Sequence, residues 1–209
     1  DNISRMELLS KCAFEDSIGV QLKQKNLLFT YHPETTQSIE EIEADFVEIL
    51  GALDTLNDCL LIFTKANADV GGRLINKMID QYVANNPSKA VAFTSLGQLR
   101  YLSALQYVDA VIGNSSSGIV EAPSFKVASI NIGSRQKGRV RAESTLDVDV
   151  RKQQIIDAIE TIYTSFFQTQ LQTVINPYGQ GNSSKKLVDI IKSIDLQQLK
   201  SKKFYDVGL

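Results

Sequence analysis

The chain has few cysteines, a single histidine and no long apolar run. The two cysteines, Cys12 and Cys59, have no second cysteine or histidine at ligand spacing, which argues against structural zinc and against a disulfide framework. Each lies in an apolar stretch, so both are interpreted as core thiols. No apolar run approaches the roughly 18 residues that a membrane span requires, and the N-terminus lacks the pattern of a signal peptide.

An excess of basic residues is also missing. The 22 Lys and Arg residues face 24 Asp and Glu residues, and the formal net charge is -2. We therefore expect no nucleic-acid partner, no membrane partner and a cytoplasmic protein. The 209 residues suffice to bury a continuous core without a metal or disulfides. Because the chain begins with Asp1 rather than Met, we expect a processed product or a piece of a longer polypeptide.

Short apolar runs recur along the chain and predict buried strands. They lie at residues 26–30, 59–64, 90–93, 110–112 and 128–132. Their hydrophobicity is continuous rather than alternating, which is typical of parallel strands that helices cover on both faces. Helical patterns occupy residues 39–53, 72–83, 97–105 and 118–125. We therefore predict an α/β fold with a Rossmann-like, doubly wound parallel sheet.

The sequence divides into three predicted parts. These are a connecting segment at 1–25, a Rossmann-like domain at 26–182, and a C-terminal helix and tail at 183–209. Within the second part, a long helix is predicted at 150–166. The final helix is expected to use Ser183 or Ser184 as its N-cap, because a serine side chain can accept a hydrogen bond from the first free N–H groups.

The most informative stretch follows the strand at 110–112. Gly113 allows the backbone to turn, the hydroxyls of Ser115, Ser116 and Ser117 follow, and a helix starts. Backbone N–H groups, hydroxyl donors and the positive end of a helix then converge, which predicts an anion site, above all for phosphate. The alternative interpretation is an ordinary serine-rich helix cap.

Other candidate residues lie on the same chain segments or at another strand end. Glu121 follows one to two turns into the helix, where its carboxylate can accept hydrogen bonds from a ribose diol; the alternative is a surface glutamate. In the basic loop after the strand at 128–132, Arg135 and Arg139 can clamp a diphosphate, because a guanidinium fork suits phosphate oxygens. The alternative is a solvated loop. The only histidine, His32, follows the first strand and can stabilise or protonate a departing phosphate, unless it is structural.

Several familiar sites are absent from the sequence. No G-x-G-x-x-G follows a strand, and no G-x-x-x-x-G-K-[ST] occurs. The turn at 113–117, which we call the serine turn, does not supply the G-x-S-x-G of a Ser-His-Asp hydrolase. Dinucleotide-binding, P-loop and serine-hydrolase interpretations therefore lose their main support.

Taken together, the motifs resemble the hydrolysing UDP-N-acetylglucosamine 2-epimerases, especially the branch that feeds sialic-acid and related nonulosonic-acid synthesis. The matching motifs are YHPET at 31–35, KANADVGG at 65–72, GNSSSG at 113–118 with EAPSF at 121–125, INIG at 130–133 with RQKGR at 135–139, and NPYG at 176–179. They occur in this order across nearly the whole chain, so the match is specific.

The resemblance implies two Rossmann-like domains that face each other across a cleft, the GT-B arrangement, and this chain is similar to the C-terminal domain. It implies that Ser115 and Ser116 bind the diphosphate of UDP-N-acetylglucosamine, Glu121 the ribose, Arg135 the phosphates, and the backbone near Leu96 the uracil. His32 is implied to be the one catalytic group on this half.

By the same resemblance, the enzyme eliminates UDP from the sugar to give a glycal and then adds water to release N-acetylmannosamine, without a metal or nicotinamide. The N-terminal domain with its proton-transferring carboxylates is expected to be missing. We thus expect this piece to bind UDP weakly without turnover, and its parent to be a homo-oligomer. The alternatives are a GT-B nucleotide-sugar glycosyltransferase domain, which can use the same fold, and a non-catalytic nucleotide-binding module.

Overall fold

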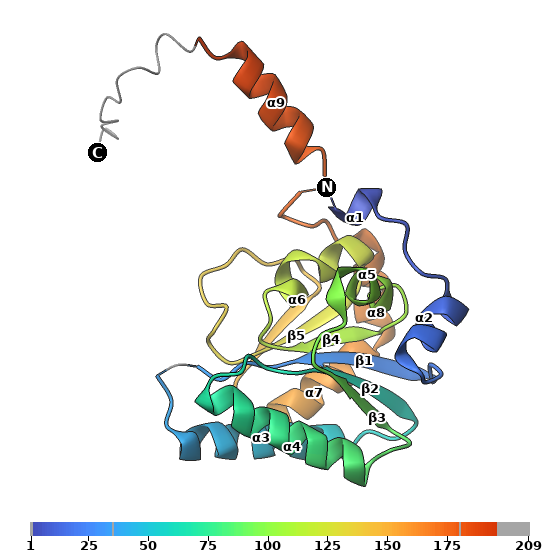
Figure 1. The fold of residues 1–209 in the computed structure, drawn as a ribbon, viewed down its shortest axis with the longest axis vertical. Helices are drawn as coiled ribbons and strands as arrows, with labels where there is room; N and C mark the ends of the chain where they lie inside the picture. The colour runs from blue at the N-terminus through green and yellow to red at the C-terminus, as the bar shows by residue number, and fades with distance from the viewer. Residues whose placement is uncertain (1, 35, 180, 196–209) are drawn as a thin grey trace.

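The computed structural model describes residues 2–34, 36–179 and 181–195. Its six strands form one parallel sheet in the order β3-β2-β1-β4-β5-β6 (Figure 1). The strands are β1 (Lys25–Thr30), β2 (Cys59–Thr64), β3 (Ala90–Phe93), β4 (Ala110–Gly113), β5 (Ala128–Ile132) and β6 (Thr145–Val148). The strand order reverses between β1 and β4, so the predicted Rossmann-like, doubly wound sheet is confirmed.

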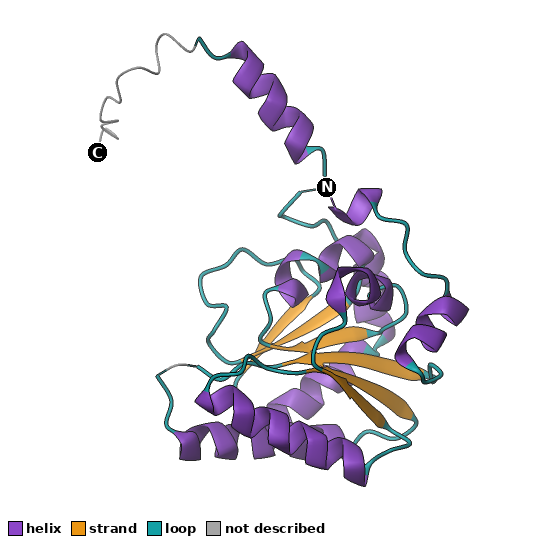
Figure 2. Ribbon diagram, in the orientation of Figure 1, coloured by secondary structure: helices purple, strands orange, loops and turns teal. Residues whose placement is uncertain are grey.

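Helices cover both faces of this sheet (Figure 2). On one face, Leu27 and Phe29 of β1 are buried in a cluster with side chains of α3 (Ile39–Asp54), α4 (Val70–Asn85) and α7 (Lys152–Ile162). On the other face, Leu28 is buried with side chains of α2 (Lys11–Ile18) and α5 (Gly97–Ala104). Successive strand residues point to opposite faces, so both must be apolar, which explains the continuous hydrophobic runs.

Two predicted helices are each divided in the structure. The helix expected at 150–166 consists of α7 and α8 (Ser165–Thr173), because the Thr164 hydroxyl accepts a hydrogen bond from the Phe167 N–H (3.3 Å) and starts a new helix. The helix expected at 118–125 consists of α6 (Ser117–Val120) and the 3-10 helix η1 (Ala122–Phe125). Pro123 has no N–H to donate, so it interrupts the helix there.

Other details also correct the sequence interpretation. The final helix, α9 (Ser183–Ser193), includes both serines, and Asn182, with a left-handed φ of 64°, occupies the cap position. The edge strand β6 was not predicted, because its residues are only partly buried and alternate in polarity. Cys59 is buried as expected, but Cys12 is exposed, so it is not a core thiol.

The two ends of the chain differ in their packing. At the N-terminus, α1 (Asn2–Arg5) leads to α2, which packs Phe14 and Ile18 into the core. At the other end, α9 extends away from the sheet (Figure 1). The three-part division of the chain stays a prediction, and residues 196–209 of its last part lie outside the described residues. None of the helices that the structure describes is long and apolar enough to cross a membrane.

Candidate functional site

The carboxyl ends of β1, β2 and β4 meet at the centre of one sheet edge. Thr30, the last residue of β1, pairs with Thr64 of β2 on one side and with Gly113 of β4 on the other. A Cβ on Gly113 would lie 1.9 Å from the Thr30 carbonyl oxygen, and its φ is +127°, so only glycine fits here. The residues that follow these strands, including His32 and the serine turn, therefore emerge side by side.

A cavity of about 470 Å³ opens at this edge, and we call it the serine cavity. It receives the predicted residues His32, Leu96, Ser115 and Glu121 from three different chain segments. The rest of its lining is Thr30, Thr64, Lys65, Thr94, Ser95, Gly97, Gln98, Tyr101, Leu102 and Ser117. Its size falls in the range of small-molecule sites, and its wall is rich in hydroxyl groups.

The serine turn supplies both donors and a carboxylate to this cavity. The Ser117 hydroxyl donates a short hydrogen bond to Glu121 Oε2, and the Ser117 N–H donates to Ser115 Oγ (3.4 Å). Ser116 does not line the cavity; its carbonyl accepts the N–H of Val120 (2.9 Å). Because α6 has only four residues, its dipole is weak, so the predicted anion would depend on hydroxyl and backbone donors rather than on a long helix.

A second cavity of about 310 Å³ adjoins the first, and we call it the arginine cavity. It is lined by His32, Pro33, Glu34, Thr36, Asn67, Asp69 and Arg135. His32 lines both cavities. Burial lowers the pKa of His32 below its ordinary value of 6.5; the Arg135 charge lowers it further, whereas Asp69 acts in the opposite direction. Burial therefore favours the neutral form of the imidazole.

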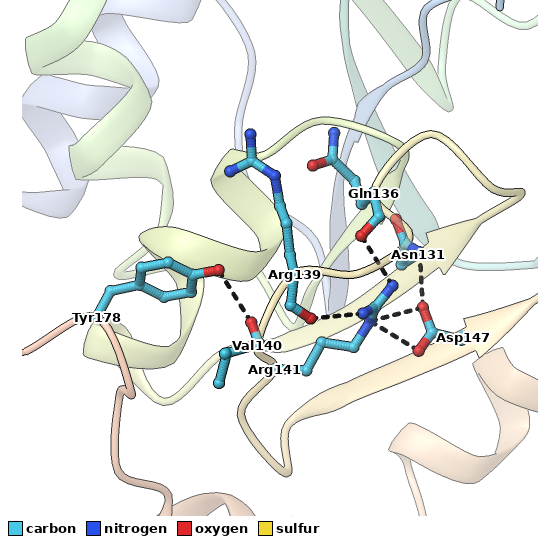
Figure 3. Close-up of polar contacts among 7 residues, drawn as sticks. All are labelled: Asn131, Gln136, Arg139, Val140, Arg141, Asp147 and Tyr178. Atoms are coloured by element: carbon cyan, nitrogen blue, oxygen red, sulfur yellow. Dashed lines mark hydrogen bonds and ion pairs between the residues drawn. The ribbon is translucent and has the colours of Figure 1, made fainter. Parts of the chain in front are cut away.

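The two predicted clamp arginines have different surroundings. Arg135 donates from Nη1 to the Asn114 carbonyl (3.0 Å), which holds it one residue away from Ser115. Arg139 lines neither cavity, and Figure 3 shows its guanidinium extending away from Arg141 and Asp147. The structure therefore brings Arg135, but not Arg139, to His32.

A buried polar network fixes the backbone behind these residues, and the sequence reading missed it. Asn114 is only 1% exposed; its Oδ1 accepts the His32 N–H (2.8 Å) and its Nδ2 donates to the His32 carbonyl (2.7 Å). Gln136, also buried, donates from Nε2 to the Asn114 carbonyl (2.8 Å). Buried amides of this kind must be paired, so Asn114 locks the two strand ends together. The sequence offered one sign of this role, namely that Asn114 stands between Gly113 and three serines at the end of a predicted strand.

The basic loop itself is folded around a different arginine. Arg141 forms an ion pair with Asp147 of β6 (2.8 Å) and donates to the carbonyls of Arg139 (2.7 Å) and Gln136 (3.1 Å). Asp147 also accepts a hydrogen bond from Asn131 (2.6 Å; Figure 3). Arg141 therefore stabilises the fold of the loop and is not available to bind a phosphate. Among the described residues, no cluster of His, Cys, Asp and Glu side chains can hold a metal ion.

The turn before α5 gives the serine cavity its third wall. Leu96 is buried and is followed by Gly97, whose φ is +64°. Arg100 donates from Nε to the Leu96 carbonyl (2.9 Å) and from Nη2 to the Ser95 carbonyl (3.2 Å). A third bond, from Nη1 to the carbonyl of Ser17 in α2 (3.3 Å), ties the turn to the N-terminal segment. The turn is therefore rigidly held.

Comparison with known proteins places these features in one family. The family described as UDP-N-acetylglucosamine 2-epimerase matches residues 2–192 of the chain. A GDP/UDP-N,N'-diacetylbacillosamine 2-epimerase (hydrolyzing) from Campylobacter jejuni is 38% identical over 206 residues, which are 98% of this chain and 53% of that relative. Polysialic acid biosynthesis protein P7 from Escherichia coli is 35% identical over 213 residues, which are 99% of this chain and 52% of that protein.

A solved structure shows the same fold. The S. aureus MnaA-UDP co-structure superposes with a TM-score of 0.67 at 20% sequence identity, and the match covers 97% of this chain and 52% of that chain. The chain thus spans about half the length of the curated relatives it matches.

Proposed function

Because the chain belongs to the UDP-N-acetylglucosamine 2-epimerase family, we propose that it is the UDP-binding, C-terminal half of a hydrolysing 2-epimerase. The full enzyme would convert UDP-N-acetylglucosamine to N-acetylmannosamine and UDP. The observation that carries this proposal is the serine cavity, which Ser115, Glu121, Leu96 and His32 line together. This arrangement offers donors for phosphate, a carboxylate for ribose and the backbone of the turn at Leu96 for a base.

Each group has a role that its chemistry suits. The Ser115 hydroxyl donates to the diphosphate, and Arg135 neutralises its charge. Ser116 and Arg139, which line neither cavity, have no such role in this proposal. Glu121 exchanges its hydrogen bond with Ser117 for bonds from the ribose diol, and the backbone near Leu96 binds the uracil. Because Glu121 and Ser117 are already paired, part of the ribose contact is offset by the bond that is lost.

His32 is the proposed catalytic residue of this half. A bound diphosphate beside the imidazole raises its pKa again, because a nearby negative charge favours the protonated form. The protonated imidazole can then donate a proton to the phosphate oxygen as the bond to the sugar breaks. Substrate binding thus prepares the acid that the departing UDP requires.

The proton must be removed from the second carbon of the sugar by the other half of the enzyme. We propose that this half alone binds UDP without turnover, because elimination requires a base and a cleft closed to water. A second candidate sugar is N,N'-diacetylbacillosamine, which the name of the 38% identical Campylobacter relative contains. Both candidates share the UDP that the serine cavity would hold.

Calorimetry with UDP tests the binding proposal. Arg135→Ala should weaken binding about 10- to 150-fold, since a charge-assisted hydrogen bond contributes about 1.5–3 kcal/mol. Lys77→Ala, which removes an exposed charge from α4 outside both cavities, should leave the affinity unchanged. Absence of UDP binding, or an unchanged affinity in Arg135→Ala, would contradict the proposal.

A second experiment separates the epimerase from a glycosyltransferase of the same fold. The full-length parent is incubated with UDP-N-acetylglucosamine and no acceptor. An epimerase releases free N-acetylmannosamine together with UDP, whereas a glycosyltransferase without acceptor does not. A parallel incubation with UDP-N,N'-diacetylbacillosamine distinguishes the two candidate sugars.

A further inference from the structure

The junction between α6 and η1 lacks one hydrogen-bond donor. In a continuous helix, the carbonyl of Val120 would accept from the N–H of residue 123 or 124. Residue 123 is proline and has no N–H, and the N–H of Ser124 donates instead to the Glu121 carbonyl (3.0 Å). The carbonyl that immediately precedes Glu121 therefore needs a partner from elsewhere in the chain.

That partner is a side chain 56 positions away. Asn176, only 8% exposed, donates from Nδ2 to the Val120 carbonyl (2.8 Å) and also contacts Ser124 Oγ (2.7 Å). Its Oδ1 accepts the N–H of Tyr178 (2.9 Å), which folds the surrounding turn. The Asn176 amide thus uses both of its ends.

The turn at 176–179 is in turn anchored to the basic loop. The Tyr178 hydroxyl donates to the Val140 carbonyl (3.1 Å; Figure 3), next to the Arg139 carbonyl that Arg141 already binds. A third cavity, of about 300 Å³, lies behind Glu121 and is walled by Asn176, Tyr178 and Gly179, among other residues. Glu121 therefore stands between the serine cavity in front and this space behind it.

From this geometry we propose that Asn176 is a positioning residue for Glu121. Its amide replaces the N–H that Pro123 lacks, fixes the Val120–Glu121 peptide, and so directs the carboxylate into the serine cavity rather than into the space behind it. The inference rests on the proposed function, because it assigns Asn176 to the recognition of ribose in UDP. Without the Asn176 amide, the Val120–Glu121 peptide can rotate, and the Glu121 carboxylate no longer points steadily into the serine cavity.

The test compares UDP with 2'-deoxy-UDP, which lacks one of the hydroxyls that Glu121 would bind. The wild-type chain should bind UDP about tenfold more tightly than 2'-deoxy-UDP, the effect of one lost charge-assisted hydrogen bond. Asn176→Asp keeps the shape and the acceptor for Tyr178 but removes the Nδ2 donor. In this variant the ratio of the two affinities should fall to nearly one, mainly through weaker binding of UDP.

Two further variants separate positioning from general stability. Asn86→Asp removes an amide that donates to the Tyr82 carbonyl (2.9 Å) at the end of α4, at the opposite sheet edge, and should leave the ratio unchanged. Adding Pro123→Ala to Asn176→Asp restores an N–H for Val120 and should recover at least part of the ratio. Thermal unfolding of each variant reports whether the chain remains folded.

The outcomes are distinguishable. If the wild-type chain does not bind UDP, the proposed function fails and the ribose role of Glu121 fails with it. If UDP binds but the ratio is the same in wild type and Asn176→Asp, only the positioning role is overturned. A ratio that falls in Asn176→Asp, stays unchanged in Asn86→Asp and rises again with Pro123→Ala supports it.

Discussion

Replacing Asn114 by alanine removes the two side-chain hydrogen bonds that join the ends of β1 and β4. The partners are the N–H and the carbonyl of His32, at 2.8 and 2.7 Å. A buried group left without a partner costs about 1–3 kcal/mol, and the partly buried His32 backbone places each loss in the lower half of that range. We therefore expect the free energy of unfolding to fall by about 2–4 kcal/mol.

The chain contains a matched control for this variant. Asn76 makes the same pair of bonds to Ala66, which follows β2: its Oδ1 accepts the Ala66 N–H (2.8 Å) and its Nδ2 donates to the Ala66 carbonyl (3.1 Å). Asn76→Ala should therefore destabilise the chain by a similar amount. Ala66 lines neither the serine cavity nor the arginine cavity, so this variant should retain UDP affinity that Asn114→Ala loses.

Urea denaturation measures the stabilities, and a lower midpoint with an unchanged slope indicates a true loss of stability. Calorimetry with UDP, at a temperature where both variants are folded, measures binding. A destabilisation below about 1 kcal/mol in Asn114→Ala would show that water replaces both bonds, and the reasoning would be wrong. Equal losses of UDP affinity in the two variants would refute the specific link to His32.

Three more predictions concern other parts of the site. The pKa of His32 lies below 6.5 in the folded chain, so the unfolded chain binds more protons near that pH and the free energy of unfolding should fall as the pH drops from about 7.5 to 5.5. In urea denaturation at several pH values, His32→Gln should make this fall smaller. Gly113→Ala places Cβ 1.9 Å from a carbonyl oxygen and should unfold the domain in a thermal melt, whereas Gly138→Ala, also at positive φ but in open space, should cost only about 1 kcal/mol. Arg100→Lys loses the three-carbonyl fork behind the proposed uracil turn and should weaken UDP binding about tenfold in calorimetry, while leaving the affinity for inorganic pyrophosphate unchanged.

The sequence was a good guide where one strong physical signal acted alone. Continuous apolar runs located five of the six strands that the structure describes, because a strand buried on both faces has to be apolar throughout. The edge strand β6 has a less buried, mixed sequence and was missed. The division of two predicted helices, at Pro123 and at Thr164, was missed, because a missing N–H and a local cap each interrupt an otherwise helical pattern there.

The candidate site was predictable to the extent that topology determines it. Residues that follow parallel strands must emerge at one edge, and this places His32, Ser115 and Glu121 around one cavity. The amides of Asn114 and Asn176 could not be identified in this way, because their partners lie 82 and 56 positions away along the chain. The separation of Arg135 from Arg139 likewise depends on how Arg141 folds the loop.

The shared wall at His32 has a thermodynamic consequence. Since His32 lines both cavities, a charged molecule in either of them would change the proton affinity of its imidazole. Charged occupants of the two cavities would therefore be energetically coupled even if they never touched, and the coupling would be reciprocal. Two bound anions would each favour the protonated form of His32. Binding of both anions would therefore be tighter at low pH and weaker at high pH.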